Sequence, residues 1–244
     1  MIYLKNLSKH FGNTKAVDRL NLHILPGEIF GFIGPNGAGK TTTILMMAGL
    51  LEPTEGSVTI DGIDMASQPE EAKRRIGLIP DRPFLYEKLT GMEFLMFTAD
   101  LYGINLENFS EKAEKFLSIF SLLDRAHELI ESYSHGMKQR LIMSAALLHD
   151  PRLIIVDEPM VGLDPKGIKI VRNLFRELSS NGTTIFMSTH TLKLAEDVCD
   201  RIGVINKGSL IASGTISDLK ETVQIRKGDL EKVFFQLTEE KNDS

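Results

Sequence analysis

Apolar and polar residues alternate in short runs along the first part of the chain. The alternation is clear in segments 2–7 and 20–25, and segment 57–65 holds two such runs around an Asp-Gly turn. This spacing is typical of β-strands with one buried face, and the turn is typical of an antiparallel hairpin. Segment 28–34 is apolar almost throughout and leads into a glycine-rich loop and a helical pattern. The front of the chain therefore predicts β-structure, a buried strand and a deeply packed helix.

The middle of the chain, from about residue 83 to residue 151, has a different period. Segments 93–103, 108–120 and 138–150 repeat apolar residues at intervals of three and four. That spacing places the apolar side chains on one face of a helix. We therefore expect an α-helical subdomain inserted into the strand-forming sequence.

Short apolar runs return after residue 152 and alternate with helical stretches. The runs are 153–159, 183–190 and 201–208, and the helical stretches between them are 166–180 and 192–200. Such βαβ alternation implies a parallel sheet. The sequence thus predicts a single α/β domain over 1–244. Its parts are a mostly parallel catalytic core with an antiparallel β part (about 1–82 and 152–215), the helical subdomain (about 83–151) and a C-terminal tail (about 216–244).

Composition and charge narrow the classes of partner. Hydrophobic residues make up 42% and charged residues 25%, as in an ordinary globular protein. The 28 basic and 33 acidic residues leave a formal charge of -5, so we expect no nucleic-acid partner. The single cysteine, Cys199, allows no intrachain disulfide and fits the cytosol. No apolar run approaches the roughly 20 residues of a bilayer-spanning helix, so we expect membrane work to go through a partner.

Residues 34–41 match the phosphate-loop pattern GxxxxGK[ST] between a predicted strand and a predicted helix. In this arrangement backbone N–H groups and a helix N-terminus surround phosphate oxygens. We expect Lys40 to reach the β- and γ-phosphates, Thr41 to ligate Mg²⁺ and Thr42 to assist a phosphate. The predicted nucleotide-contacting residues of the loop are Gly34, Pro35, Asn36, Gly37, Ala38, Gly39, Lys40, Thr41 and Thr42. The core is thus predicted to be a P-loop NTPase that binds ATP and Mg²⁺.

An acidic pair and a histidine follow two of the later apolar runs. Asp157 and Glu158 end the run 153–158, and His190 ends the run 183–190. Ligands of open α/β sheets bind at the carboxyl ends of strands. We expect Asp157 to hold Mg²⁺ through water, Glu158 to act as general base and His190 to reach the γ-phosphate or Glu158. Lys40, Glu158 and His190 are therefore the predicted catalytic residues.

Together with segment 133–140, these motifs resemble the ATP-binding cassette (ABC) family of transporter ATPases across nearly the whole chain. The family pattern LSGGQ(x)QR is matched at Ser134, Gly136, Gln139 and Arg140, whereas Tyr133, His135 and Met137 replace the usual Leu, Gly and Gln. Ser134 and Gly136 begin a predicted helix, whose N-terminus attracts an anion. A plain helix cap at Ser134 is the alternative. The resemblance implies that the anion is the γ-phosphate of ATP held by a second cassette, identical or related.

The resemblance assigns three more residues. Phe11 falls where an aromatic ring stacks on adenine, although a core phenylalanine is the alternative. Asp164 falls in the loop between the two shared sites, although a turn aspartate before proline is the alternative. Asp81 stands where the family usually has a glutamine that contacts Mg²⁺ and the attacking water. A carboxylate there can still ligate the metal but adds negative charge, so we expect altered hydrolysis or coupling.

The resemblance also implies partners. We expect an ATP-hydrolysing subunit that dimerises around two Mg-ATP and drives a separate integral-membrane permease from the inner face of the cell membrane. The end of the chain resembles single-cassette subunits of bacterial exporters, and segment 84–86 lies where permeases dock, unless it packs within the helical subdomain. A soluble ABC-type ATPase of translation or DNA repair is the alternative, although those relatives usually carry two cassettes or long coiled-coil insertions. A P-loop kinase or GTPase would leave segment 133–140 unexplained.

Overall fold

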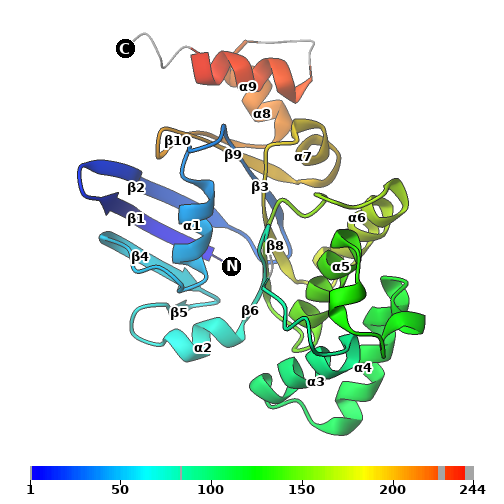
Figure 1. Ribbon diagram of the computed structural model, residues 1–244. Coiled ribbons are helices and arrows are strands. Elements are labelled where there is room, and N and C mark those ends of the chain that lie inside the picture. The colour runs from blue at the N-terminus through cyan, green and yellow to red at the C-terminus, as the bar shows by residue number, and fades with distance from the viewer. Residues whose placement is uncertain (1, 83, 225–228, 240–244) are drawn as a thin grey trace.

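The computed structural model describes residues 2–82, 84–224 and 229–239, which form two sheets flanked by helices (Figure 1). The first sheet is antiparallel, with strand order β2-β1-β4-β5. Its strands are β1 (Ile2–Phe11), β2 (Thr14–Ile24), β4 (Glu55–Ile60) and β5 (Ile63–Asp64). The predicted N-terminal antiparallel part is therefore confirmed.

The second sheet has the order β10-β9-β3-β8-β7-β6. Its strands are β3 (Ile29–Ile33), β6 (Ile76–Ile79), β7 (Leu153–Asp157), β8 (Thr184–Thr189), β9 (Arg201–Asn206) and β10 (Ser209–Gly214). All neighbours pair in parallel except β10, which runs antiparallel to β9. The mostly parallel α/β fold is confirmed. Strand β6 was not predicted, because four residues are too few to display a period.

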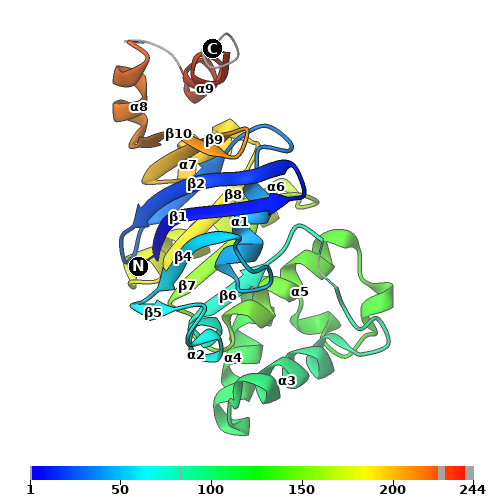
Figure 2. The same cartoon turned by 90° about the vertical axis from the view of Figure 1, so that its left-hand side faces the viewer.

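Helix α1 (Lys40–Met47) lies between the two sheets (Figures 1 and 2). Its Ile44 and Met46 belong to one buried cluster with Leu4 of β1 and Phe32 of β3. Burial from both sides explains why apolar residues surround this helix. The packing holds the start of α1 against the end of β3.

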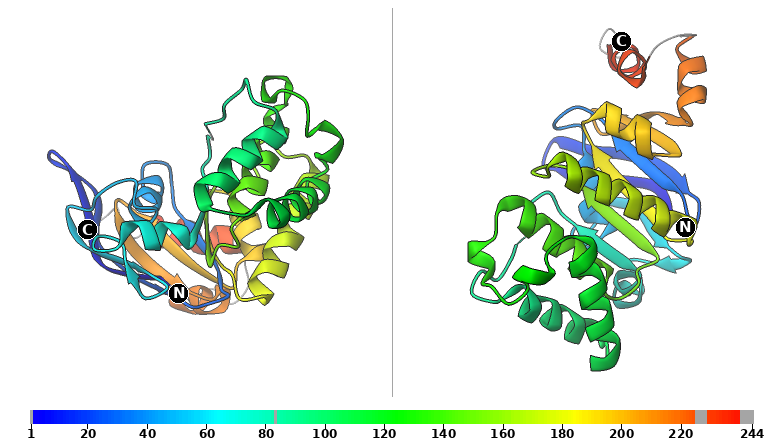
Figure 3. Two further views of the ribbon diagram at one scale, coloured as in Figure 1. Left: turned by 90° about the horizontal axis from the view of Figure 1, so that it is seen from below. Right: turned by 90° about the vertical axis from the view of Figure 1, so that its right-hand side faces the viewer.

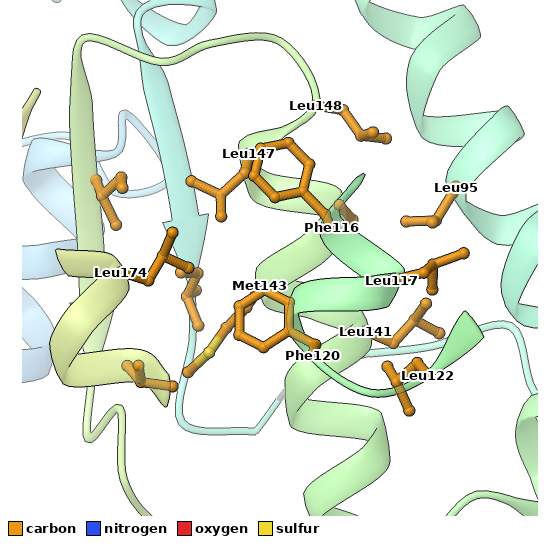
Figure 4. Close-up of a cluster of buried hydrophobic side chains, with 14 of the residues drawn as sticks. Leu95, Phe116, Leu117, Phe120, Leu122, Leu141, Met143, Leu147, Leu148 and Leu174 are labelled. Atoms are coloured by element: carbon orange, nitrogen blue, oxygen red, sulfur yellow. The ribbon is translucent and has the colours of Figure 1, made fainter. Parts of the chain in front are cut away.

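The helical subdomain projects from the β6 side of the core (Figures 2 and 3). It contains α3 (Gly91–Tyr102), α4 (Leu106–Ile119) and α5 (His135–Leu147), with 3-10 turns at Leu123–Arg125 and Ile130–Ser132. Its core gathers Phe116, Phe120 and Leu141 and continues to Leu174 of α6 (Pro165–Ser180) (Figure 4). This shared core joins the subdomain to the sheet.

The remaining helices cover the core. They are α2 (Pro69–Arg74), α6 (Pro165–Ser180), α7 (Leu192–Val198), α8 (Ile216–Thr222) and α9 (Leu230–Glu239). In the tail, α8 and α9 lie on the β10 side of the molecule (Figure 1), and Leu219 and Val233 share a buried cluster with Ala195 of α7. No helix in the described ranges combines the length and the apolar character that a membrane crossing requires.

Candidate functional site

The strand order brings the predicted site segments to one edge of the second sheet. Strands β3, β8, β7 and β6 are consecutive neighbours and run in parallel, so their carboxyl ends share that edge. The 34–39 loop follows β3, His190 follows β8, Glu158 follows β7 and Asp81 lies two residues beyond β6. The crevice beyond the carboxyl ends of such strands is where α/β sheets bind ligands.

The loop before α1 leaves a helix N-terminus without a side-chain cap. Gly39 occupies the N-cap position with φ 108°, and no side chain caps this helix. A Cβ on Gly39 would lie 2.5 Å from the Ala16 carbonyl oxygen, and one on Gly34 would lie 2.4 Å from that of Ile205. Only glycine fits this conformation and this space. The first-turn N–H groups and the positive end of the helix dipole are therefore suited to an anion.

Lys40 folds back over the loop that precedes it. Its Nζ donates to the carbonyl oxygens of Gly34 at 2.8 Å and Pro35 at 3.1 Å, and the residue is 8% exposed. Burial lowers the pKa of Lys40, while the negative charges of Glu158 and Asp157 act in the opposite direction. The ammonium group is thus held within the loop.

Asp157 and Thr41 form the acidic side of the site. The Thr41 hydroxyl donates to Asp157 Oδ2 at 3.0 Å, and Asp157 is 6% exposed. Burial raises the pKa of Asp157, the Ser188 and Thr41 hydroxyls oppose the rise, and the charges of Glu158 and Asp81 add to it. A cation bound beside Asp157 would stabilise the charged carboxylate that burial disfavours.

The oxygen donors of this acidic side fit Mg²⁺, which prefers a few carboxylates together with substrate phosphates and water. The described part of the chain contains no cluster of three or more His, Cys, Asp or Glu residues placed to hold a metal.

Glu158 is held by three groups at the end of β8. Its Oε2 accepts from the Thr189 hydroxyl at 3.0 Å, and its Oε1 accepts from the backbone N–H of His190 at 2.9 Å. The same Oε1 lies 2.6 Å from His190 Nδ1. The predicted proximity of His190 and Glu158 is thus present in the structure. Thr189 was not predicted as a site residue, because nothing but its place before His190 marks it.

Residues Ser134 and Asp164 belong to a second location. Ser134 caps α5 by accepting from the Met137 N–H at 3.3 Å, and Asp164 caps α6 by accepting from the Gly167 N–H at 2.9 Å. In the ranges that the structure describes, neither side chain forms a hydrogen bond with the 34–41 loop. The capping roles, which the sequence left open as alternatives, are therefore present in the single chain.

Phe11 and Asp81 are two further residues that the sequence assigned to the site. Phe11 is 52% exposed, with Lys9 Nζ 5.4 Å from its ring centroid. The alternative of a core phenylalanine is therefore wrong. The Asp81 carboxylate is half-exposed and lies 4.0 Å from the Arg82 guanidinium, and its negative charge contributes to the raised pKa of Asp157.

Comparison with known proteins gives one consistent result. The profile of the ABC transporter family matches residues 17–161. The bacitracin transport ATP-binding protein BcrA of Bacillus licheniformis is 41% identical over 222 residues, which span 91% of this chain and 72% of BcrA. A solved ATP-binding subunit of an ABC transporter is 34% identical with a TM-score of 0.93, covering 97% of this chain and 99% of that one. The dimeric cassette MJ0796, bound to ADP and Pi in a post-hydrolysis state, is 26% identical with a TM-score of 0.78, covering 88% and 99%.

Proposed function

This chain belongs to the ABC transporter family as an ATP-binding subunit, and from that premise we propose that it hydrolyses Mg-ATP to power a separate membrane permease. The observation that carries the proposal is the arrangement at one sheet edge. There the Lys40 ammonium lies within the glycine loop, the Thr41 hydroxyl contacts Asp157, and Glu158 is hydrogen-bonded beside them. Binding, charge neutralisation and proton transfer would each have a residue in place.

In the proposed site the uncapped start of α1 and Lys40 bind the triphosphate. The loop N–H groups face the phosphate oxygens, and the ammonium offsets the charge on the β- and γ-groups. Thr41 and Asp157 would hold Mg²⁺, with Asp81 as an additional carboxylate. When bound, this ion supplies electrostatic stabilisation of the charge that develops on the transferred phosphoryl group. Phe11, which is exposed, offers its ring to adenine.

Glu158 would accept the proton of the attacking water. Its Oε1 is held by His190 and its Oε2 by Thr189, and Oε2 keeps a second lone pair that can accept from the water. His190 is suited to orient Glu158 and to donate to the γ-phosphate, because its side chain is largely exposed beside the carboxylate. Proton transfer by a positioned carboxylate contributes roughly 10²- to 10⁴-fold to a rate.

We propose that Ser134, Gly136 and Asp164 act on the nucleotide of a second cassette, so that two chains close around two Mg-ATP. Within their own chain the Ser134 and Asp164 side chains cap α5 and α6 and, in the described ranges, form no hydrogen bond with the 34–41 loop, which agrees with this assignment. The dimeric MJ0796 cassette, with its similar fold, supports it as well. A contribution from each chain to each site would couple nucleotide binding to association.

A surface of three exposed aromatic residues, Phe84, Tyr86 and Phe97, supports the permease contact. Phe84 is 80% exposed and Tyr86 49%, and both Phe84 and Phe97 meet Tyr86 edge to face at 5.6 Å between ring centroids. Leu85 between them is buried, so packing within the subdomain accounts for that residue alone. We propose that this aromatic surface docks an integral-membrane permease of an exporter on the inner face of the cell membrane.

The shared-site proposal is tested with Glu158→Gln, which removes the base and keeps the side-chain volume. We expect this variant to convert from monomer to dimer when Mg-ATP is added, because ATP binds but is not consumed. Light scattering after size-exclusion chromatography measures the mass. Glu114→Gln, on the exposed face of α4, is the matched control and should hydrolyse ATP like the unmodified chain.

Adding Lys40→Ala to Glu158→Gln should abolish both ATP retention and the dimer. A Glu158→Gln chain that stays monomeric with bound ATP would contradict the shared site. A Glu158→Gln chain with normal turnover would contradict the assignment of the base.

A further inference from the structure

The turn that starts α5 packs directly on Gly162. A Cβ built on Gly162 would lie 2.2 Å from Cδ2 and 2.9 Å from Nε2 of the His135 ring, and one on Gly136 would lie 2.8 Å from the Gly162 carbonyl oxygen. Gly162 itself has φ 78°. The His135 imidazole therefore packs against the backbone of Gly162. Any side chain at position 162 would overlap the ring.

This contact connects two parts of the molecule that are distant in sequence. His135 is the first residue of α5 in the helical subdomain, and Gly162 lies two residues before Asp164, which caps α6 of the core. In the described part of the chain, the His135 ring has no hydrogen bond and no ion pair. The contact between the exposed His135 ring and the Gly162 backbone is therefore one of van der Waals packing.

We infer that His135 is a positioning residue, whose ring on Gly162 fixes the Ser134 turn relative to Asp164 so that both meet the second cassette as one unit. The inference rests on the proposed function, in which these two turns face the partner. It goes beyond the family pattern, because the usual glycine at position 135 would have no ring to seat. Where the family usually has a glycine, this chain thus has an imidazole ring that contacts Gly162, between the Ser134 turn and the turn before Asp164.

The first test removes the His135 ring in the Glu158→Gln background. His135→Ala should leave the affinity of the single chain for Mg-ADP unchanged, because the 34–41 loop is not touched. The ATP concentration for half-maximal dimer formation should rise on the order of tenfold, which corresponds to about 1.4 kcal/mol of lost contact with the partner's nucleotide. His127→Ala, at an exposed position of the same subdomain, is the matched control.

The second test is whether a substitution at His135 compensates for one at Gly162. Gly162→Ala should also impair ATP-driven dimerisation, because its methyl group would displace the ring. Combining it with His135→Gly removes the obstacle and should recover part of the loss. Mg-ADP titration calorimetry verifies that each variant retains a folded nucleotide site.

These experiments distinguish a failure of the proposed function from a failure of the inference about His135. If the Glu158→Gln parent binds ATP without dimerising, the proposed function fails. If the parent dimerises and His135→Ala does so at the same ATP concentration, the inference is overturned. It is also overturned if the double variant is no better than Gly162→Ala alone, since backbone strain at a positive φ would then explain the whole effect.

Discussion

Two oppositely charged side chains are buried at the candidate site, and burial disfavours the charged form of each. It lowers the pKa of Lys40 and raises that of Asp157. Their mutual attraction offsets part of this cost in the free chain. A phosphate beside Lys40 and a cation beside Asp157 would offset more, so the site suits a ligand that carries both charges.

Asp81 is a third carboxylate at the candidate site, in addition to Asp157 and Glu158. The variant Asp81→Gln tests its role. A carboxylate binds Mg²⁺ more strongly than an amide. We therefore expect the Mg²⁺ concentration for half-maximal stimulated turnover to rise about tenfold, the lower end of the effect of losing a supporting group at a metal site. Turnover at saturating Mg²⁺ should change as well, because a charge beside the γ-phosphate is removed.

The measurement is ATPase rate against Mg²⁺ concentration, with Asp124→Asn on the exposed surface as the control. If Asp81→Gln alters neither the rate nor the Mg²⁺ dependence, Asp81 has no part in metal binding or coupling.

At the scale of elements, His149 connects the helical subdomain to the sheet. It follows the end of α5, its Nε2 lies 3.0 Å from the Ile76 carbonyl oxygen of β6, and its ring stacks on Tyr102 of α3 at 3.8 Å. Burial lowers the pKa of His149, while the contact with Ile76 and the charge of Asp150 oppose the shift. A neutral imidazole thus joins three elements.

This histidine predicts an acid-sensitive stability. The unfolded chain protonates His149 near its ordinary pKa of about 6.5, whereas the folded chain does so only at lower pH. The free energy of unfolding should therefore fall as pH drops below about 6.5, at up to about 1.4 kcal/mol per pH unit, until the lower folded pKa is reached.

Urea unfolding between about pH 7 and pH 5 measures the slope. His149→Gln keeps an amide donor for Ile76 and removes the titration, so its stability should fall less steeply with acid. The exposed His127→Gln is the control. Equal slopes for His149→Gln and the unmodified chain would show that His149 does not titrate differently in the two states.

At the scale of the whole molecule, the proposed function divides each nucleotide site into two halves that two chains contribute. The nucleotide-binding half lies at the sheet edge, and the half at Ser134 and Asp164 lies where α5 and α6 begin. In a two-fold dimer each surface meets its complement on the other chain. The chain is therefore expected to be inactive in hydrolysis unless it is paired.

Mixing two inactive variants tests this arrangement. Lys40→Ala disables the phosphate loop, and Ser134→Asp keeps a good helix cap while placing a negative charge against the γ-phosphate. Each alone should lack turnover. At equal concentrations about half of the dimers are mixed and each contains one intact site, so about a quarter of the normal rate should return. Absence of any recovery in a steady-state ATPase assay would contradict sites shared between chains.

The sequence alone determined the local features of this protein. Strand and helix periods follow from which side chains face a core, and the glycines of the 34–41 loop follow from a backbone that approaches other atoms closely. The places of Asp157, Glu158 and His190 at the carboxyl ends of strands were also readable, because each polar residue ends or follows a short apolar run.

Which of these segments are neighbours follows from the packing of the whole fold. The order β3-β8-β7-β6 puts the loop, His190, Glu158 and Asp81 on one edge, and no local pattern encodes that order. Three further features depend on how distant segments pack. They are the exposure of Phe11, the hydrogen bond from Thr189 to Glu158 and the contact of the His135 ring with Gly162. Periodicity reports the environment of each residue, whereas adjacency is set by the packing of the complete core.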